Sequence, residues 1–143
     1  MSENRKVILG RFIKEVWSEG LVDACDTYLS EFYTIWHDPG DLWDGQKLDV
    51  EGFKERVRKS REPCPDQKFE VQEMFAENNA VIVTWKWSAT HKGEIAGFPA
   101  TGKRLFMSGA TVYYFDDRDR IAGHWQIADR LSVFRQLQEA RAG

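Results

Sequence analysis

The chain has 143 residues, of which 42% are hydrophobic and 13% aromatic, and its formal net charge is −3. This length suits one domain, residues 1–143, with enough apolar surface for a core and an internal pocket, so a second domain is not expected. Lysines and arginines are scattered and form no basic stripe, which argues against nucleic acid as a partner.

The N-terminal segment, residues 1–6, is polar and resembles neither a signal peptide nor a membrane anchor. A cytoplasmic protein with no membrane partner is therefore expected. The two cysteines, Cys25 and Cys64, lie in different predicted elements and lack a Cys-x-x-Cys motif. We interpret both as plain thiols.

The first part of the chain predicts helices near residues 4–18, 22–29 and 49–60. Apolar residues at three- and four-residue spacing give the first helix one buried stripe, Gly20 ends it, and Asp49 is a plausible N-cap of the third. Between the second and third helices, an aromatic extended segment ends at a Pro-Gly turn and delivers His37 to the edge of a cavity.

The second part predicts four strands and a short terminal helix, near residues 67–76, 79–91, 103–116, 119–128 and 130–139. The second strand alternates most clearly, with Val81, Val83, Trp85 and Trp87 on one side. Asp129 can cap the terminal helix. Helices followed by an antiparallel meander predict an α+β domain whose curved sheet wraps over the helices.

Two polar residues on the last strand are candidates for a functional site. His124 and Gln126 are two positions apart, so their side chains point to the same face of the sheet, together with Ala122 and Ala128. Small residues around polar ones favour a lined cavity. The alternative is a solvated sheet face, which antiparallel sheets often have.

Several ordered motifs resemble the SnoaL-like polyketide cyclases. They are YTIWHDP at residues 33–39, SATHKGEIAGFPATGKR at residues 88–104 and RIAGHWQIAD at residues 120–129. The resemblance covers nearly the whole chain. It implies the cone-shaped α+β barrel shared with nuclear transport factor 2 and ketosteroid isomerase, with a mostly antiparallel sheet over N-terminal helices. It also implies a homodimer without metal or cofactor.

The resemblance further implies an intramolecular aldol ring closure of an aromatic polyketide ester, with a carboxylate two residues beyond the closing-strand histidine as acid and base. That position is Gln126 here. An amide donates and accepts hydrogen bonds but cannot take a proton from carbon. A second histidine of the cyclase pattern, on the preceding strand, is replaced by Val112, which we expect to contact the substrate.

Each remaining candidate has a functional and a structural interpretation. His124 could transfer protons near neutral pH or be held for structure; His37 and His91 could contact a substrate or fix a turn and a loop. Trp17 and Trp36 could stack on a planar ligand or fill the core. No pair of histidines has the spacing of a preformed metal site, so no metal is expected.

Two functions follow. The first is a cofactor-independent cyclase-like enzyme on a hydrophobic carbonyl compound, with His124 as proton shuttle and Gln126 holding an enolate oxygen. The second is a noncatalytic pocket protein that binds an apolar small molecule. An epoxide hydrolase is a lesser option, because it would need an Asp-Arg-Asp set, and Arg104, Asp116 and Asp129 have no visible reason to converge. A homodimer through the sheet is also expected, since Trp85, Trp87 and Trp125 cannot all point into one small cavity.

Overall fold

A computed structural model of the protein describes residues 2–142. In chain order, its elements are α1 (Ser2–Phe12), η1 (Ile13–Ser18), η2 (Val22–Ala24), α2 (Cys25–Tyr28), β1 (Leu29–His37), β2 (Lys47–Asp49), α3 (Val50–Arg61), β3 (Lys68–Glu77), β4 (Ala80–Thr90), β5 (Arg104–Phe115), β6 (Ile121–Ala128) and α4 (Arg130–Ala142). The segment η1 is a π-helical continuation of α1, and η2 is a single 3₁₀ turn.

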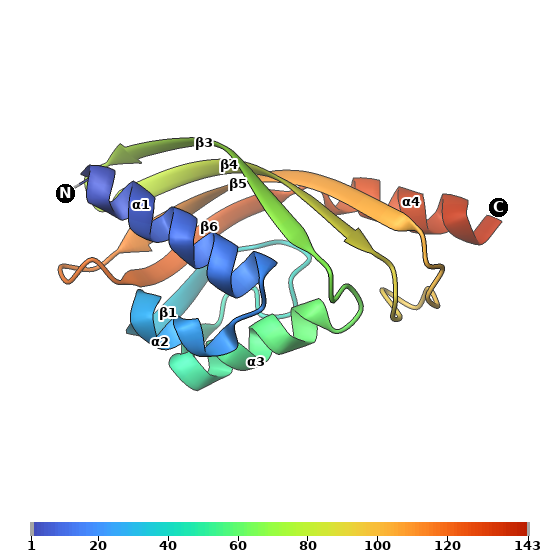
Figure 1. The fold of residues 1–143 in the computed structure, drawn as a ribbon, viewed down its shortest axis with the longest axis horizontal. Helices are drawn as coiled ribbons and strands as arrows, with labels where there is room; N and C mark the ends of the chain where they lie inside the picture. Colours follow the sequence, from blue (N-terminus) through green and yellow to red (C-terminus); the bar gives the residue numbers. More distant parts are fainter. Residues whose placement is uncertain (1, 143) are drawn as a thin grey trace.

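The strands of the described chain form one mixed sheet in the order β2-β1-β6-β5-β4-β3, which stays open at both edges (Figure 1). The predicted antiparallel meander is present as β3 to β6. In addition, β1 pairs with β6 in parallel, and β2 pairs with β1 in antiparallel. The predicted α+β class, with a curved and mostly antiparallel sheet over N-terminal helices, is confirmed.

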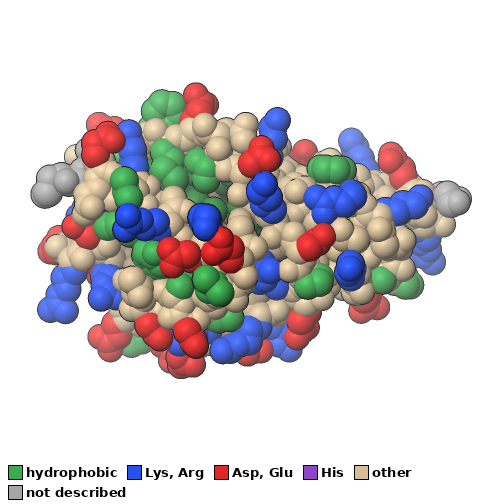
Figure 2. Space-filling model, in the orientation of Figure 1, with side chains coloured by type: hydrophobic (Ala, Val, Ile, Leu, Met, Phe, Trp, Pro, Cys, Tyr) green, Lys and Arg blue, Asp and Glu red, His purple; other side chains and the backbone are tan. Residues whose placement is uncertain are grey.

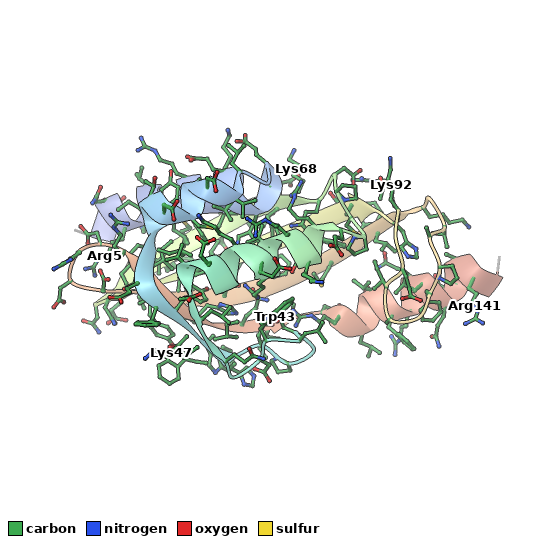
Figure 3. The ribbon with its side chains drawn as sticks, turned by 90° about the horizontal axis from the view of Figure 1, so that it is seen from below. Arg5, Trp43, Lys47, Lys68, Lys92 and Arg141 are labelled. Carbon is green, nitrogen blue, oxygen red and sulfur yellow. The ribbon has the colours of Figure 1, made fainter. Side chains whose placement is uncertain are left out.

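One face of the sheet, called the inner face, packs against α1, α2 and α3, whereas α4 extends past the end of the sheet (Figures 1 and 3). Phe12 lies near the centre of the core. Its ring centroid is 6.1 Å from those of Tyr28 and Tyr113 and 6.0 Å from that of Phe53. Aromatic pairs in such tilted and edge-on arrangements join the helices to the sheet.

Strand alternation decides which side chains face the helices. Along β4, Val81, Val83, Trp85 and Trp87 are all buried on the inner face, as predicted. The opposite, outer face exposes large apolar side chains from four strands, among them Phe75, Ile82, Phe106, Trp125 and Ile127. The three tryptophans therefore do not share one surface: only Trp125 lies on the outer face, because it is out of phase with the inner set.

The bounds of the other elements agree with the ranges predicted from the sequence to within a few residues. The prediction omitted one feature of the sheet. The side chains of Asp49 and Asp129 accept hydrogen bonds from the amides of Gly52 (2.7 Å) and Ser132 (3.1 Å), which confirms both helix caps. The omission is that residues 29–37 and 47–49 join the sheet. No hairpin turn links β1 to β6, so their parallel pairing leaves no local signal in the sequence.

The surface seen in Figure 2 carries basic and acidic side chains intermixed, without a continuous stripe of one sign. Within residues 2–142, no helix is long and apolar enough to cross a membrane.

Candidate active site

The structure places His124 and Gln126 together on the inner face of β6, as their spacing predicts. In the sheet register, His124 lies opposite Tyr113 of β5, and Gln126 lies opposite Thr111. The imidazole is only 2% exposed, whereas Gln126 is half-buried. The pair therefore faces the protein interior, which excludes the alternative of a solvated sheet face at His124.

A carboxylate that the sequence did not single out joins this pair. Asp38 follows the last residue of β1 and is fully buried. Its Oδ2 accepts a hydrogen bond of 2.8 Å from Nε2 of His124, and its two oxygens lie 3.1 and 3.2 Å from Nε2 of Gln126. The parallel pairing of β1 with β6 produces this contact, because it carries the end of β1 beside the end of β6.

The protonation states of this cluster follow from its partners. Burial alone would raise the pKa of Asp38, but the hydrogen bond from His124 and the charges of Arg130 and Arg56 lower it below its ordinary value. Burial lowers the pKa of His124 and outweighs the opposing effect of Asp38. At neutral pH an ionised Asp38 therefore accepts from the Nε2–H group of a neutral imidazole.

The other imidazole nitrogen faces a buried hydroxyl. Nδ1 of His124 lies 2.5 Å from the hydroxyl oxygen of Tyr33, which is 1% exposed. Burial raises the pKa of Tyr33 well above its ordinary value, so the phenol keeps its proton. Because Nε2 carries the imidazole proton, Tyr33 donates to Nδ1. Both nitrogens of His124 are thus held in one orientation.

A chain of hydrogen bonds also sets the direction of the Gln126 amide. The indole Nε1–H group of Trp85 donates to Oγ1 of Thr111 (2.9 Å), which in turn donates to Oε1 of Gln126 (2.6 Å). An indole N–H group only donates, so the amide must present its Nε2 to Asp38. A Cβ at Gly109 would lie 2.7 Å from Cη2 of Trp85, so only glycine leaves room for this indole.

Two arginines complete the surroundings of Asp38. Nη2 of Arg56, from α3, lies 3.3 Å from Oδ2 of Asp38 and 3.0 Å from Oδ2 of Asp41. Nη1 of Arg130, at the start of α4, donates to Oδ1 of Asp38 at 2.8 Å and to the carbonyl of Pro39 at 2.6 Å. The predicted ligand-stacking residue Trp17 lies in the core with its ring under Arg56, 5.1 Å from the guanidinium carbon.

Three other predicted substrate-contacting residues lie on the outer face, away from His124. Trp36 is 64% exposed, and Val112 pairs with the outer-face residue Trp125. His37 is half-buried and its ring stacks on that of Trp125, with 4.5 Å between centroids. The structure therefore does not bring these three side chains to the cluster around His124. Val112 is one position out of phase with Thr111 and Tyr113, which are the inner-face residues of β5.

His91 and the cysteines lie outside the cluster. Nδ1 of His91 is 3.0 Å from Oγ1 of Thr101, which favours the loop-fixing interpretation. Cys25 and Cys64 are free and buried, and burial raises the pKa of both thiols to about 11. Within residues 2–142, no three His, Cys, Asp or Glu side chains are grouped to hold a metal ion.

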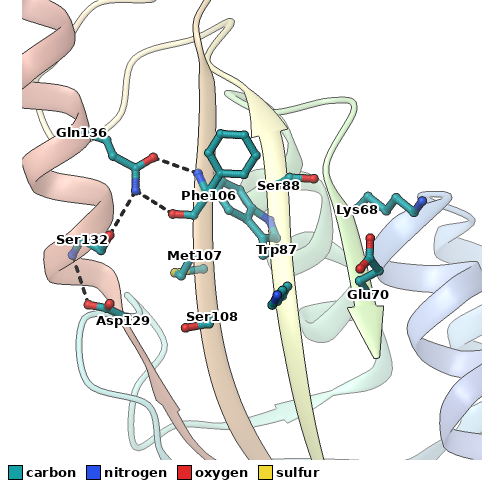
Figure 4. Close-up of a pocket in the computed structure, with 11 residues that line it drawn as sticks. Lys68, Glu70, Trp87, Ser88, Phe106, Met107, Ser108, Asp129, Ser132 and Gln136 are labelled. Atoms are coloured by element: carbon teal, nitrogen blue, oxygen red, sulfur yellow. Dashed lines mark hydrogen bonds between the residues drawn. The ribbon is translucent and has the colours of Figure 1, made fainter. Parts of the chain in front are cut away.

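A groove of about 440 Å³ lies on the outer face, between α4 and β3 (Figure 4). At its edge the side-chain amide of Gln136 bonds to both the amide (2.9 Å) and the carbonyl (2.7 Å) of Phe106. Gln136 thereby continues the pairing of β5 beyond the end of β6. The groove is separated from Asp38 and His124 by the sheet itself, so it is not part of the candidate site.

Comparison with known proteins places the chain in a family. A family model described as SnoaL-like polyketide cyclase matches residues 7–137. The chain belongs to this family. Among solved structures, a candidate polyketide cyclase from Acidithiobacillus ferrooxidans is 57% identical, with a TM-score of 0.91 over 95% of each chain. The comparison with curated proteins gave no match.

Two more distant solved structures share the fold. IdmH, a candidate polyketide cyclase from Streptomyces antibioticus, is 22% identical with a TM-score of 0.78, over 94% of this chain and 98% of its own. AclR, a candidate hydroxylase from Streptomyces galilaeus, is 20% identical with a TM-score of 0.78, over 97% and 98%. The resemblance of the sequence to the SnoaL-like cyclases, and the cone fold it implied, are thus confirmed.

Proposed function

We propose that this SnoaL-like protein is a cofactor-independent acid-base enzyme that acts on a hydrophobic carbonyl compound, as in a cyclase-like ring closure. The observation that carries the proposal is the buried, ionised carboxylate of Asp38 bonded to both His124 and Gln126. Gln126 stands where the cyclases have a carboxylate, and a carboxylate lies 3.1 Å from its amide. In this proposal Asp38, the residue after β1, takes the place of the carboxylate that the cyclases carry on β6.

Each residue of this cluster has its own role in the proposed proton transfer. Asp38 is the proton acceptor of the pair, and His124 stabilises its charge by donating from Nε2. The Gln126 amide, fixed by Thr111, holds the carboxylate in position. Because Asp38 and His124 interact strongly, we expect their titration to appear as that of a pair.

Burial of the inner-face residues suggests from which side a substrate would reach the site. Tyr113, Thr111 and His124 are buried, whereas Gly109, in the first half of β5, and Gln126 and Ala128, toward the end of β6, are half-buried. Exposure on the inner face of β6 thus increases from His124 toward Ala128. A planar apolar substrate entering there would meet Gln126 and then Asp38.

The test is turnover of a panel of aromatic polyketide methyl esters by the wild type, Asp38→Asn and His124→Ala, with circular dichroism to verify folding. Loss of a general acid or base should lower turnover roughly 10²- to 10⁴-fold. Gln138→Glu, on the exposed surface of α4, is the control and should retain wild-type turnover. Wild-type turnover that survives both site substitutions in folded protein would exclude this mechanism.

One observation favours the second function, a noncatalytic pocket protein. Asp38 and His124 are 0% and 2% exposed, and their polar atoms are all bonded within the protein. In this second function, the cluster would orient a bound apolar molecule and would take no part in proton transfer. A wild type that binds the esters without converting any of them would support this alternative.

We also infer a homodimer that buries the outer face. Phe75 is 58% exposed and Ile127 is 49% exposed on this face, and an apolar surface spread over four strands is typical of an association site. Sedimentation at micromolar concentration should give a dimer for the wild type and for the control Val7→Asp on α1. Ile127→Asp should shift it toward the 16.6 kDa monomer. A wild type that sediments only as a monomer would contradict the inference.

A further inference from the structure

Arg130 is the accessible member of the ionic cluster around Asp38. Its side chain is 31% exposed, compared with 6% for Arg56, 10% for Asp41 and 0% for Asp38. It is also the first residue of α4, where a positive charge opposes the helix dipole. Its position is therefore not explained by helix stability, but by its contact with Asp38.

The two oxygens of Asp38 have different surroundings. Oδ2 faces the buried side chains of His124 and Arg56 and also receives Gln126. Oδ1 receives only Gln126 and Arg130, the two more accessible partners. Oδ1 is thus on the more accessible side of the carboxylate, and Arg130 covers it.

The guanidinium of Arg130 has donors to spare. Nη1 makes both of its hydrogen bonds, to Asp38 and Pro39, and Nη2 lies 3.8 Å from Asp41, beyond hydrogen-bond length. Among the residues that the structure describes, Nη2 and Nε of Arg130 make no hydrogen bond. Gly40 leaves space beside this side chain, since a Cβ there would lie 2.7 Å from Cδ of Arg130. A guanidinium whose Nη2 and Nε groups are free to donate is well suited to bind an oxygen atom of a ligand.

We propose that Arg130 is a catalytic residue that binds the carbonyl oxygen of the substrate and, in doing so, uncovers Oδ1 of Asp38 as the base. The proposal rests on the acid-base function inferred above. In the step, the C–H bond beside the carbonyl breaks, its proton bonds to Oδ1, and its electron pair forms the enolate. The enolate oxygen carries the resulting negative charge and is held by Arg130.

The exchange of partners makes Asp38 a stronger base at the moment of reaction. Arg130 lowers the pKa of Asp38, so its departure to the substrate raises that pKa. The other groups that face Asp38 stay in place: Arg56 from α3, His124 from β6, Tyr33 from β1, Tyr113 from β5, and Asp41 and Asp44 from the loop after β1. A shift of the acid limb of the pH profile when Arg130 is replaced can therefore be assigned to Arg130 and not to these other groups.

The kinetic test compares Arg130→Met with Arg135→Met, a control on the exposed surface of α4. Arg130→Met should lower kcat by roughly 10²- to 10³-fold, as for loss of an oxyanion donor. It should also move the acid limb of kcat/KM upward by about one pH unit or more. Added guanidinium ion should restore part of the turnover. A lower kcat with an unmoved acid limb and no rescue would assign Arg130 a structural role and overturn the proposal.

A binding test does not depend on turnover. Wild type should bind 2-naphthoate at least about tenfold tighter than methyl 2-naphthoate by calorimetry, since only the acid presents an anionic oxygen to Arg130. Arg130→Met should lose this preference, and Arg135→Met should keep it. Equal preference in both variants would overturn the proposal. An inactive wild type with an Arg130-dependent preference would instead refute the acid-base function while leaving Arg130 as the anion-binding residue.

Discussion

Substitution of Gln126 by glutamate tests the central contact of the site without changing its shape. The Gln126 Nε2 atom lies 3.1 and 3.2 Å from the two oxygens of Asp38. The introduced glutamate would place a second carboxylate at this distance and would remove the donor that the amide supplies. Thr111 would still donate to the retained oxygen. The change is therefore confined to charge and to one hydrogen bond.

The structure sets the magnitude and its pH dependence. Two carboxylates about 3 Å apart would repel by about 5 kcal/mol at an effective dielectric constant near 20. Protonating one of them costs less, about 4 kcal/mol at pH 7 and about 1 kcal/mol at pH 5, for an unperturbed pKa of about 4.3. The carboxyls should therefore share a proton. Because the pKa of the introduced carboxyl is raised in the folded state, the variant loses stability as pH rises.

Urea unfolding at pH 7 and pH 5 measures this effect. The difference in unfolding free energy between wild type and Gln126→Glu should be up to about 4 kcal/mol at pH 7 and should shrink by about 3 kcal/mol at pH 5. Gln138→Glu, on the exposed side of α4, should change stability by less than about 0.5 kcal/mol at either pH. A loss for Gln126→Glu that is the same at both pH values would refute the reasoning.

Three further predictions concern the packing behind Gln126, the end of β5 and the charge of Asp38. Gly109→Ala should cost about 1–3 kcal/mol in urea unfolding, because the new Cβ would overlap the Trp85 indole; unchanged stability would contradict this packing. Gln136→Ala should destabilise by about 1–2 kcal/mol and speed hydrogen exchange at the Phe106 amide, and unchanged exchange would argue against the pairing. The lowered pKa of Asp38 means that its stabilisation is present above about pH 3.9 and is lost as pH falls through the folded value. Acid titration of Asp38→Asn should therefore show a shallower acid limb, and an unaltered limb would contradict the ionised state.

Local patterns in the sequence determined most of the architecture. Period-two alternation placed Val81, Val83, Trp85 and Trp87 on one face of β4, and the same rule put His124 and Gln126 together on β6. The caps at Asp49 and Asp129 were predictable because a carboxylate before a helix accepts from the amide three residues later. Each of these features depends on residues that are close in the chain.

Contacts between distant parts of the chain decided the site. Asp38 and His124 are 86 positions apart, and they are in contact because β1 pairs with β6 in parallel. No turn motif in the sequence indicates this pairing. Arg130 is 92 positions from Asp38, and its helical position gave no sign of that partner. Val112, Trp36 and His37 were assigned to a pocket from their residue type and from the family motif, but strand phase and pairing put them on the outer face. The spacing of residues in the sequence determines which side chains of a strand share a face. Only the tertiary structure determines which strands and loops lie next to each other, because hydrogen bonds between strands join residues irrespective of their distance along the chain.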